Sequence, residues 1–100
     1  MQNSLLILKG MDIANNDLYK KGYFYAQDAA SQKAISVLAP KVGERVLDMC
    51  AAPGGKSTQI ADALCGEGLL VCNEPVPSRA KILSRNIERM GVANALVVSA

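Results

Sequence analysis

A glycine-containing loop stands between a short apolar run and a helical segment, and its residue types suit the binding of an anionic group. Gly54 and Gly55 allow the chain to bend sharply and let a ligand approach the backbone. The first amides of the helix that follows have no acceptor within the helix and can bind a carboxylate or a phosphate. Lys56 begins that helix, where a cation opposes the helix dipole, so we interpret its position as a sign of a bound anion.

A carboxylate follows this loop by about 20 residues. Glu74 ends the next apolar run, at the position where an acidic side chain accepts both hydroxyls of an adenosine ribose. Arg79 is a second cation at the start of a helix. The loop and Glu74 together predict a cofactor that carries a nucleoside.

Phosphate-bearing cofactors fit this loop poorly. Cys50 and Ala52 stand where the dinucleotide fingerprint G-x-G-x-x-G has its first two glycines, and Pro53 removes an amide donor. The triplet at 55–57 reads Gly-Lys-Ser, but Cys50 again replaces the first glycine of a P-loop. A small zwitterionic tail suits the loop better, which favours S-adenosylmethionine. An enzyme that uses nucleotide phosphates remains a further alternative.

Alternating strands and helices must position these residues. Apolar runs predict strands at Arg45–Met49, Leu69–Cys72 and Ala95–Val98, the second of them buried on both faces. Helical spacing predicts helices at Lys56–Leu64 and at Ser78–Met90, the latter capped by its first serine. Right-handed crossovers then give a three-stranded parallel sheet, with the ligand at the carboxyl ends of its strands.

The helix at 78–90 has an apolar stripe and a basic face. Its cations could touch RNA phosphates, although a solvated helix face is the preferred interpretation. The residues expected in the buried stripe are Ile82, Leu83, Ile87 and Met90, and the cations are Lys81, Arg85 and Arg89.

An N-terminal preface comes before the sheet. Short runs at Ser4–Lys9 and Tyr23–Gln27 predict two strands that pair as an antiparallel ribbon. Helical spacing from Asp28 to Pro40 predicts a packed helix. We therefore expect residues 1–40 to precede a core at 41–100. The aromatic residues at 23–25 are expected to divide between core and surface, with base stacking as the alternative.

Composition limits the class of protein. The chain has 100 residues, 50% of them hydrophobic and 20% charged, which is the balance of a folded domain and not of a disordered tail. A net charge of +2 is too small to indicate nucleic acid by itself. No run approaches the roughly 20 apolar residues of a membrane span, and no secretory leader is recognisable. We expect a cytoplasmic protein with no membrane partner.

The cysteines predict neither a disulfide framework nor a zinc site. Cys50, Cys65 and Cys72 are odd in number, share no C-x-x-C spacing, and have no histidine to accompany them. We expect no metal and interpret Cys65 and Cys72 as small buried hydrophobic residues.

The string at 46–57, Val-Leu-Asp-Met-Cys-Ala-Ala-Pro-Gly-Gly-Lys-Ser, resembles the cofactor loop of the Sun (Fmu) family of RNA cytosine-5 methyltransferases. Residues 22–32 are similar to the family's G-x-F-x-x-Q-D-x-A-S-Q segment. The family's R-x(6)-N-x-x-R-x-G helix is matched by Arg79, Asn86, Arg89 and Gly91. This resemblance covers nearly the whole chain. It implies an α/β fold, here a partial Rossmann-like methyltransferase fold of three parallel strands with flanking helices plus the N-terminal ribbon and helix.

The resemblance also implies a cofactor, a partner and residue roles. The cofactor is S-adenosylmethionine, and the partner of the full-length protein is RNA, by family habit ribosomal RNA. Glu74, which is Asp in many members, would hold the ribose, and Arg79 would reach the cofactor. The methionine part would be wrapped by Cys50, Ala51, Ala52, Pro53, Gly54, Gly55 and Lys56, with Lys56 near its carboxylate.

The chain lacks the motifs with which this family carries out its reaction. The family attacks the cytosine ring with a cysteine thiolate, and a second cysteine assists release. Both belong to later strings such as D-A-P-C-S-G, which does not occur here. We therefore expect no catalytic residue in this chain and interpret it as the first half of the catalytic domain, unable to turn over alone. A non-catalytic folding or binding module is the alternative.

The outer edge of the first predicted strand is a possible site of self-association. In the family's sheet the first strand is central, so here its outer edge would expose unpaired amides and carbonyls. This predicts self-association through that edge, by strand pairing or exchange.

Overall fold

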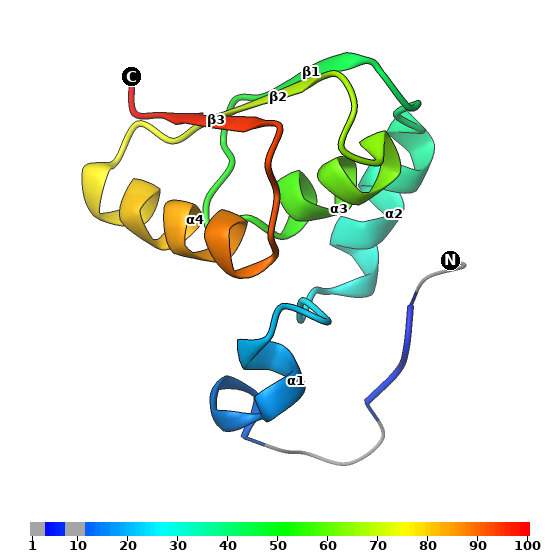
Figure 1. Cartoon of the computed structure of the whole chain (residues 1–100), viewed down its shortest axis with the longest axis vertical. Helices are drawn as coiled ribbons and strands as arrows, with labels where there is room; N and C mark the ends of the chain where they lie inside the picture. The colour runs from blue at the N-terminus through cyan, green and yellow to red at the C-terminus, as the bar shows by residue number, and fades with distance from the viewer. Residues whose placement is uncertain (1–3, 8–11) are drawn as a thin grey trace.

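Three parallel strands form the centre of the computed structural model, which describes residues 4–7 and 12–100. The strands are β1 (Arg45–Asp48), β2 (Leu69–Asn73) and β3 (Ala95–Val98), in the order β1-β2-β3. Asp48 lies beside Cys72, and Cys72 beside Val97, so the carboxyl ends of the strands are level with one another. The predicted α/β fold with a parallel three-stranded sheet is confirmed (Figure 1).

Helices cover one face of this sheet. They are α2 (Ala29–Leu38), α3 (Gly55–Leu64) and α4 (Pro77–Arg89), and Figure 1 shows them on the same side of the strands. The core between sheet and helices contains the fully buried side chains of Leu64, Leu70 and Leu83.

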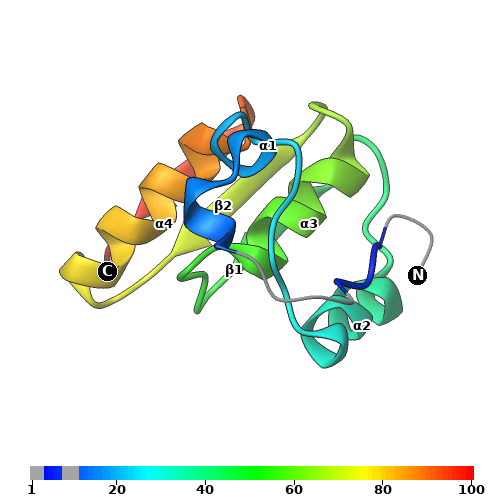
Figure 2. The same cartoon turned by 90° about the horizontal axis from the view of Figure 1, so that it is seen from below.

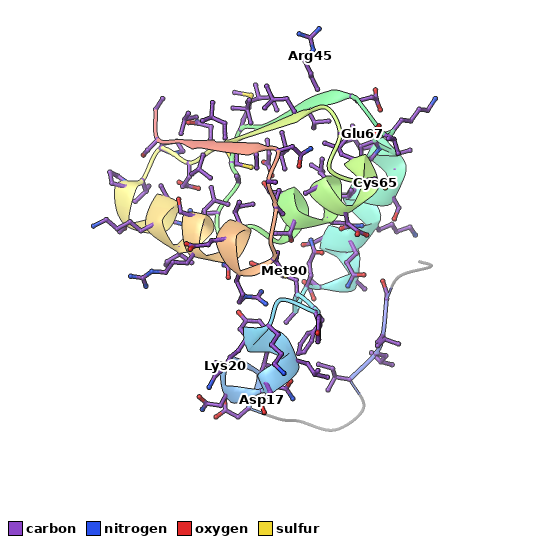
Figure 3. All side chains as sticks on the ribbon, in the orientation of Figure 1. Asp17, Lys20, Arg45, Cys65, Glu67 and Met90 are labelled. Atoms are coloured by element: carbon purple, nitrogen blue, oxygen red, sulfur yellow. The ribbon has the colours of Figure 1, made fainter. Side chains whose placement is uncertain are left out.

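The other face of the sheet has no covering element among the described residues. Leu47 of β1 is 59% exposed and Leu96 of β3 is 53% exposed, while Leu70 of β2 is 0% exposed. Figure 3 shows Arg45 projecting away from the helices on this face. The prediction that the second strand is buried on both faces is therefore wrong, since only its alternate side chains have helices packed on them.

The α4 helix differs from the sequence prediction in its start and in its buried stripe. It begins at Pro77, which suits the first helical position because proline lacks the amide that would have no acceptor there. Ser78 lies inside the helix and is not the cap. The predicted burial of Leu83 and Ile87 is confirmed, whereas Ile82 is 48% exposed and Ala80 is buried in its place. Met90 follows the last residue of the helix and is only half-buried.

The N-terminal preface contains helical turns in place of the predicted ribbon. Within 4–7 and 23–27 the structure has no strand, and the rest of the first expected strand, at 8 and 9, lies outside the described residues. Between these segments are a 3-10 turn, η1 (Ile13–Asn15), and a short helix, α1 (Asp17–Lys20), whose N-terminal amides are capped by the Asn16 side chain. The predicted helix that follows is present as α2, which packs against α3 (Figure 2).

No helix in the described ranges is long and apolar enough to cross a membrane.

Candidate functional site

The loop that joins β1 to α3 is closed by the side chain of Asp48. One carboxylate oxygen of Asp48 accepts the Ser57 hydroxyl at 2.7 Å, and the other accepts the Cys50 N–H at 3.3 Å. Ser57 lies inside α3 and is 0% exposed. Asp48 therefore ties both ends of the loop to the strand that leads into it.

Two side chains from α4 bind the backbone of this loop. The Arg79 guanidinium donates to the Ala52 carbonyl at 3.3 Å, and the Asn86 side-chain amide donates to the Pro53 carbonyl at 2.8 Å. Arg79 was expected to reach the cofactor, and here it contacts the loop that is expected to hold the cofactor. This hydrogen bond also explains why Arg79 lies near the start of α4, where the helix dipole disfavours a cation.

The two glycines of the loop make room for protein atoms. Gly54 is buried with φ +121°, and a Cβ there would lie 3.3 Å from a Leu83 methyl group. A Cβ on Gly55 would lie 3.2 Å from both the Tyr25 ring and the Gln27 side-chain nitrogen. The sequence predicted that the two glycines let a ligand approach the backbone. On the side where a Cβ would lie, they instead let α4 and the segment at 25–27 approach.

The opposite side of the loop carries its exposed groups. Cys50, Pro53 and Lys56 are exposed, whereas Ala51 is buried in the core. The first helical bond of α3 runs from the Thr58 N–H to the Gly54 carbonyl at 2.9 Å. The amides that precede Thr58 consequently have no acceptor within the helix. They and the nearby Lys56 give this end of α3 a positive potential.

Glu74 lies just beyond β2 and is almost completely buried. It is 3% exposed, and one of its carboxylate oxygens accepts the Val76 N–H at 3.1 Å. Its own N–H donates to the Val98 carbonyl, which fixes its backbone at the end of the sheet. Among the described residues no donor is recorded for the second carboxylate oxygen. That oxygen keeps the capacity to accept a hydroxyl group.

The loop, Glu74 and Arg79 are brought to the same edge of the sheet. The Ala51 N–H donates to the Asn73 carbonyl at 2.9 Å, so the loop is attached directly before Glu74. The Asn73 side chain bonds both Ala100 N–H, at 3.0 Å, and the Met49 carbonyl, at 3.4 Å. Asn73 thus links the carboxyl ends of all three strands. Sequence reasoning missed this role, although an amide side chain at the end of the central strand was a visible signal.

A pocket of about 390 Å³ lies elsewhere, between α4 and β3. It includes none of the residues predicted to bind the cofactor. Its lining residues are Pro77, Ala80, Lys81, Ser84, Arg85, Val97, Val98 and Ser99. The predicted site therefore lies outside this pocket.

The cysteines divide by burial. Cys72 is 0% exposed, as predicted, and burial raises the pKa of its thiol. Cys65 is exposed, so the prediction that it is buried is wrong. It follows the last residue of α3 in a left-handed conformation, with φ +53°, and this turns it off the packed face of the helix (Figure 3).

Comparison with known sequences places the chain among ribosomal RNA methyltransferases. The family model described as 16S rRNA methyltransferase RsmB/F matches residues 35–100. Ribosomal RNA small subunit methyltransferase F of Vibrio campbellii is 46% identical over 85 residues, which are 83% of this chain and 18% of that protein. The 25S rRNA (cytosine-C(5))-methyltransferase nop2 of Schizosaccharomyces pombe is 43% identical over 79 residues, which are 79% of this chain and 13% of that protein. The chain spans less than a fifth of either relative.

Comparison with solved structures gives the same fold. NSun6 from Pyrococcus horikoshii, solved with SFG, has a TM-score of 0.85 and 36% identity, covering 90% of this chain and 23% of that one. A methyltransferase homologue from the same organism has a TM-score of 0.83 and 30% identity, covering 92% of this chain and 30% of that one. These similarities confirm the Rossmann-like methyltransferase fold.

Proposed function

The chain belongs to the RsmB/F family of 16S rRNA methyltransferases, and from this membership we propose that it forms the S-adenosylmethionine-binding half of an RNA cytosine-5 methyltransferase. The family confirms the resemblance to Sun (Fmu) proteins that the loop at 46–57 indicated. The observation that carries the proposal is the meeting of the loop at 50–56, Glu74 and Arg79 at the carboxyl edge of the sheet.

The side chains at this edge suit the two ends of S-adenosylmethionine. The second carboxylate oxygen of Glu74 has room for a hydroxyl donor, as a ribose requires. The amides at the start of α3, which have no acceptor within the helix, suit the carboxylate of a methionine group together with Lys56. Asp48 and Arg79 would hold the loop in shape between these two ends.

The bound cofactor would supply an electrophilic methyl group, and the residues of this chain would bind and orient it. None of the three cysteines is proposed as the nucleophile. Cys72 is buried, Cys65 lies at the far end of α3, and Cys50 belongs to the loop itself. We therefore propose that these 100 residues bind the cofactor without transferring its methyl group. A non-catalytic folding or binding module derived from such a domain is the second candidate.

The partner and the place of action follow from the same proposal. We propose ribosomal RNA as the substrate of the complete protein, since the relatives named above are ribosomal RNA methyltransferases. We propose the cytoplasm as its location. Residues 1–40 are proposed as the preface that precedes the cofactor-binding core at 41–100.

Calorimetric titration tests the proposed site. S-adenosylmethionine and S-adenosylhomocysteine should bind the chain, whereas NAD and ATP should not, because the loop lacks a phosphate cradle. Glu74→Ala should weaken binding by at least about tenfold, since it removes the acceptor for the ribose. Glu67→Ala is the matched control, because Glu67 is exposed at the opposite end of α3.

Binding that is equal in both variants would contradict the site. No binding by a folded chain would favour the second candidate, a fold without cofactor affinity of its own.

A further inference from the structure

We propose that Asn86 is a positioning residue for the cofactor loop, and that it sets the direction of the Gly54 N–H toward the amino-acid end of the cofactor. This inference rests on the proposed function. It assigns to the middle of α4 a part in recognising one end of the ligand, without direct contact between Asn86 and that ligand.

The contact between Asn86 and the loop is short and well placed. The Asn86 side-chain nitrogen lies 2.8 Å from the Pro53 carbonyl oxygen, against 3.3 Å for the Arg79 bond to Ala52. Arg79 and Asn86 are seven residues apart, which is two helical turns, so they lie on the same face of α4. Two consecutive carbonyls of the loop are consequently directed at that face.

Because the peptide group is planar, the direction of the Pro53 carbonyl also fixes the direction of the Gly54 N–H. In a trans peptide the C=O and the N–H point in opposite directions. The bond between Pro53 and Gly54 is trans, since the cis bond of this loop is the one before Pro53. Because Asn86 holds the Pro53 carbonyl toward α4, the Gly54 N–H points away from α4. Among the described residues no acceptor is recorded for that N–H.

Packing restricts the loop from two sides. A Cβ on Gly54 would lie 3.5 Å from the Asn86 Cβ and 3.3 Å from Leu83, so the backbone already touches α4. The Tyr25 ring bounds the loop at Gly55, and its hydroxyl oxygen is 3.5 Å from the Asn86 side-chain nitrogen. The loop can therefore tilt, but it has no room to shift toward the helix.

The hydrogen bond itself contributes more to orientation than to stability. Asn86 binds the Pro53 carbonyl in an exposed setting, where water can replace the donor. Loss of the donor should leave the fold nearly as stable while the peptide plane becomes free to turn. A purely structural residue would not produce this separation between stability and ligand affinity.

The test compares two ligands in two variants. Asn86→Asp keeps the shape but replaces the donor with an acceptor that repels the Pro53 carbonyl, and Asn86→Ala removes the group. S-adenosylhomocysteine has the amino and carboxyl groups, whereas 5′-methylthioadenosine lacks both. In each variant the affinity for S-adenosylhomocysteine should fall about tenfold, and the affinity for 5′-methylthioadenosine should stay unchanged. Ser84→Ala, an exposed change on the same helix, should leave both affinities unchanged.

An equal loss for both ligands, or no loss for either, would overturn the inference. A ligand-free measurement keeps it testable if the wild-type chain binds neither compound, which would count against the proposed function alone. In amide NMR spectra without ligand, Asn86→Asp should shift the Gly54 resonance and lower the order parameter of the Gly54 N–H. Ser84→Ala should change neither. An unchanged Gly54 resonance in Asn86→Asp would overturn the positioning role whatever the affinities are.

Discussion

At the scale of single residues, Arg89 connects the N-terminal preface to the last helix. Its guanidinium donates to the carbonyls of Tyr19, at 2.6 Å, and Phe24, at 3.1 Å, and it stacks 3.7 Å from the centre of the Tyr19 ring. Two further guanidinium nitrogens are buried without a partner among the described residues. The sequence placed Arg89 on the wet face of its helix, because its partners lie 65 to 70 residues earlier and leave no mark in the local pattern.

Tyr25, whose ring also lies near the Arg89 guanidinium, should make the stability of the chain depend on pH in the alkaline range. Burial is the main cause that raises the pKa of its hydroxyl, the nearby Tyr19 adds to this, and Arg89 opposes it. The unfolded chain then ionises Tyr25 first, above about pH 10, while the folded chain still holds the proton. The contribution of Tyr25 to the free energy of unfolding is therefore complete below pH 10 and falls as the pH rises through its folded pKa.

Urea unfolding at a series of pH values measures this effect. Relative to the Tyr25→Phe variant, the wild-type chain should lose stability as the pH rises above about 10, since phenylalanine cannot ionise. Tyr23→Phe is the control, because Tyr23 is exposed. Parallel profiles for wild type and Tyr25→Phe across this range would show that Tyr25 does not ionise differently in the two states.

At the scale of elements, the sequence predicts the sheet and its crossover helices well and the preface poorly. The strands and helices from residue 29 onward follow from apolar spacing and from glycine and proline at the ends. The segment at 23–27 has the composition of a strand, yet it forms no strand. Its backbone and side chains bind α4 instead, and such a tertiary contact overrides strand propensity.

The buried stripe of α4 gives a prediction on stability. Ile82 and Ile87 have the same side chain on the same helix, but Ile82 is 48% exposed and Ile87 is 6% exposed. Ile87→Ala should lower the free energy of unfolding by about 2–4 kcal/mol, because it leaves a cavity in the core. Ile82→Ala should cost less than about 1 kcal/mol. Chemical denaturation of both variants checks this order, and equal losses would contradict the packing of α4.

At the scale of the whole molecule, one face of the sheet and the outer edge of β1 are uncovered in the part of the chain that the structure describes. β1 is an edge strand in the described sheet, and Leu47 and Leu96 stand open on one face. The alternation of buried and exposed positions could not be read from the uniformly apolar runs at 69–72 and 95–98. A sequence of this kind suits a strand covered on both faces, and here helices cover only one.

These features predict that the chain associates with itself in solution. Sedimentation measured over a range of concentrations should show dimers or larger species, because strand edges and apolar faces pair readily. Leu47→Lys places a charge on β1 and should reduce the association. Val37→Lys, on the exposed side of α2, should not change it. A wild-type chain that stays monomeric at its highest soluble concentration would contradict this prediction.

Mapping of ligand contacts by amide NMR tests whether the carboxyl edge of the sheet binds S-adenosylmethionine. On titration with S-adenosylhomocysteine, chemical-shift changes should be concentrated at residues 50–57 and 73–79. Residues around the pocket between α4 and β3, such as Ser84 and Val97, should be little affected. Shifts centred on that pocket, or no shift at the loop and Glu74, would contradict cofactor binding at the carboxyl edge of the sheet.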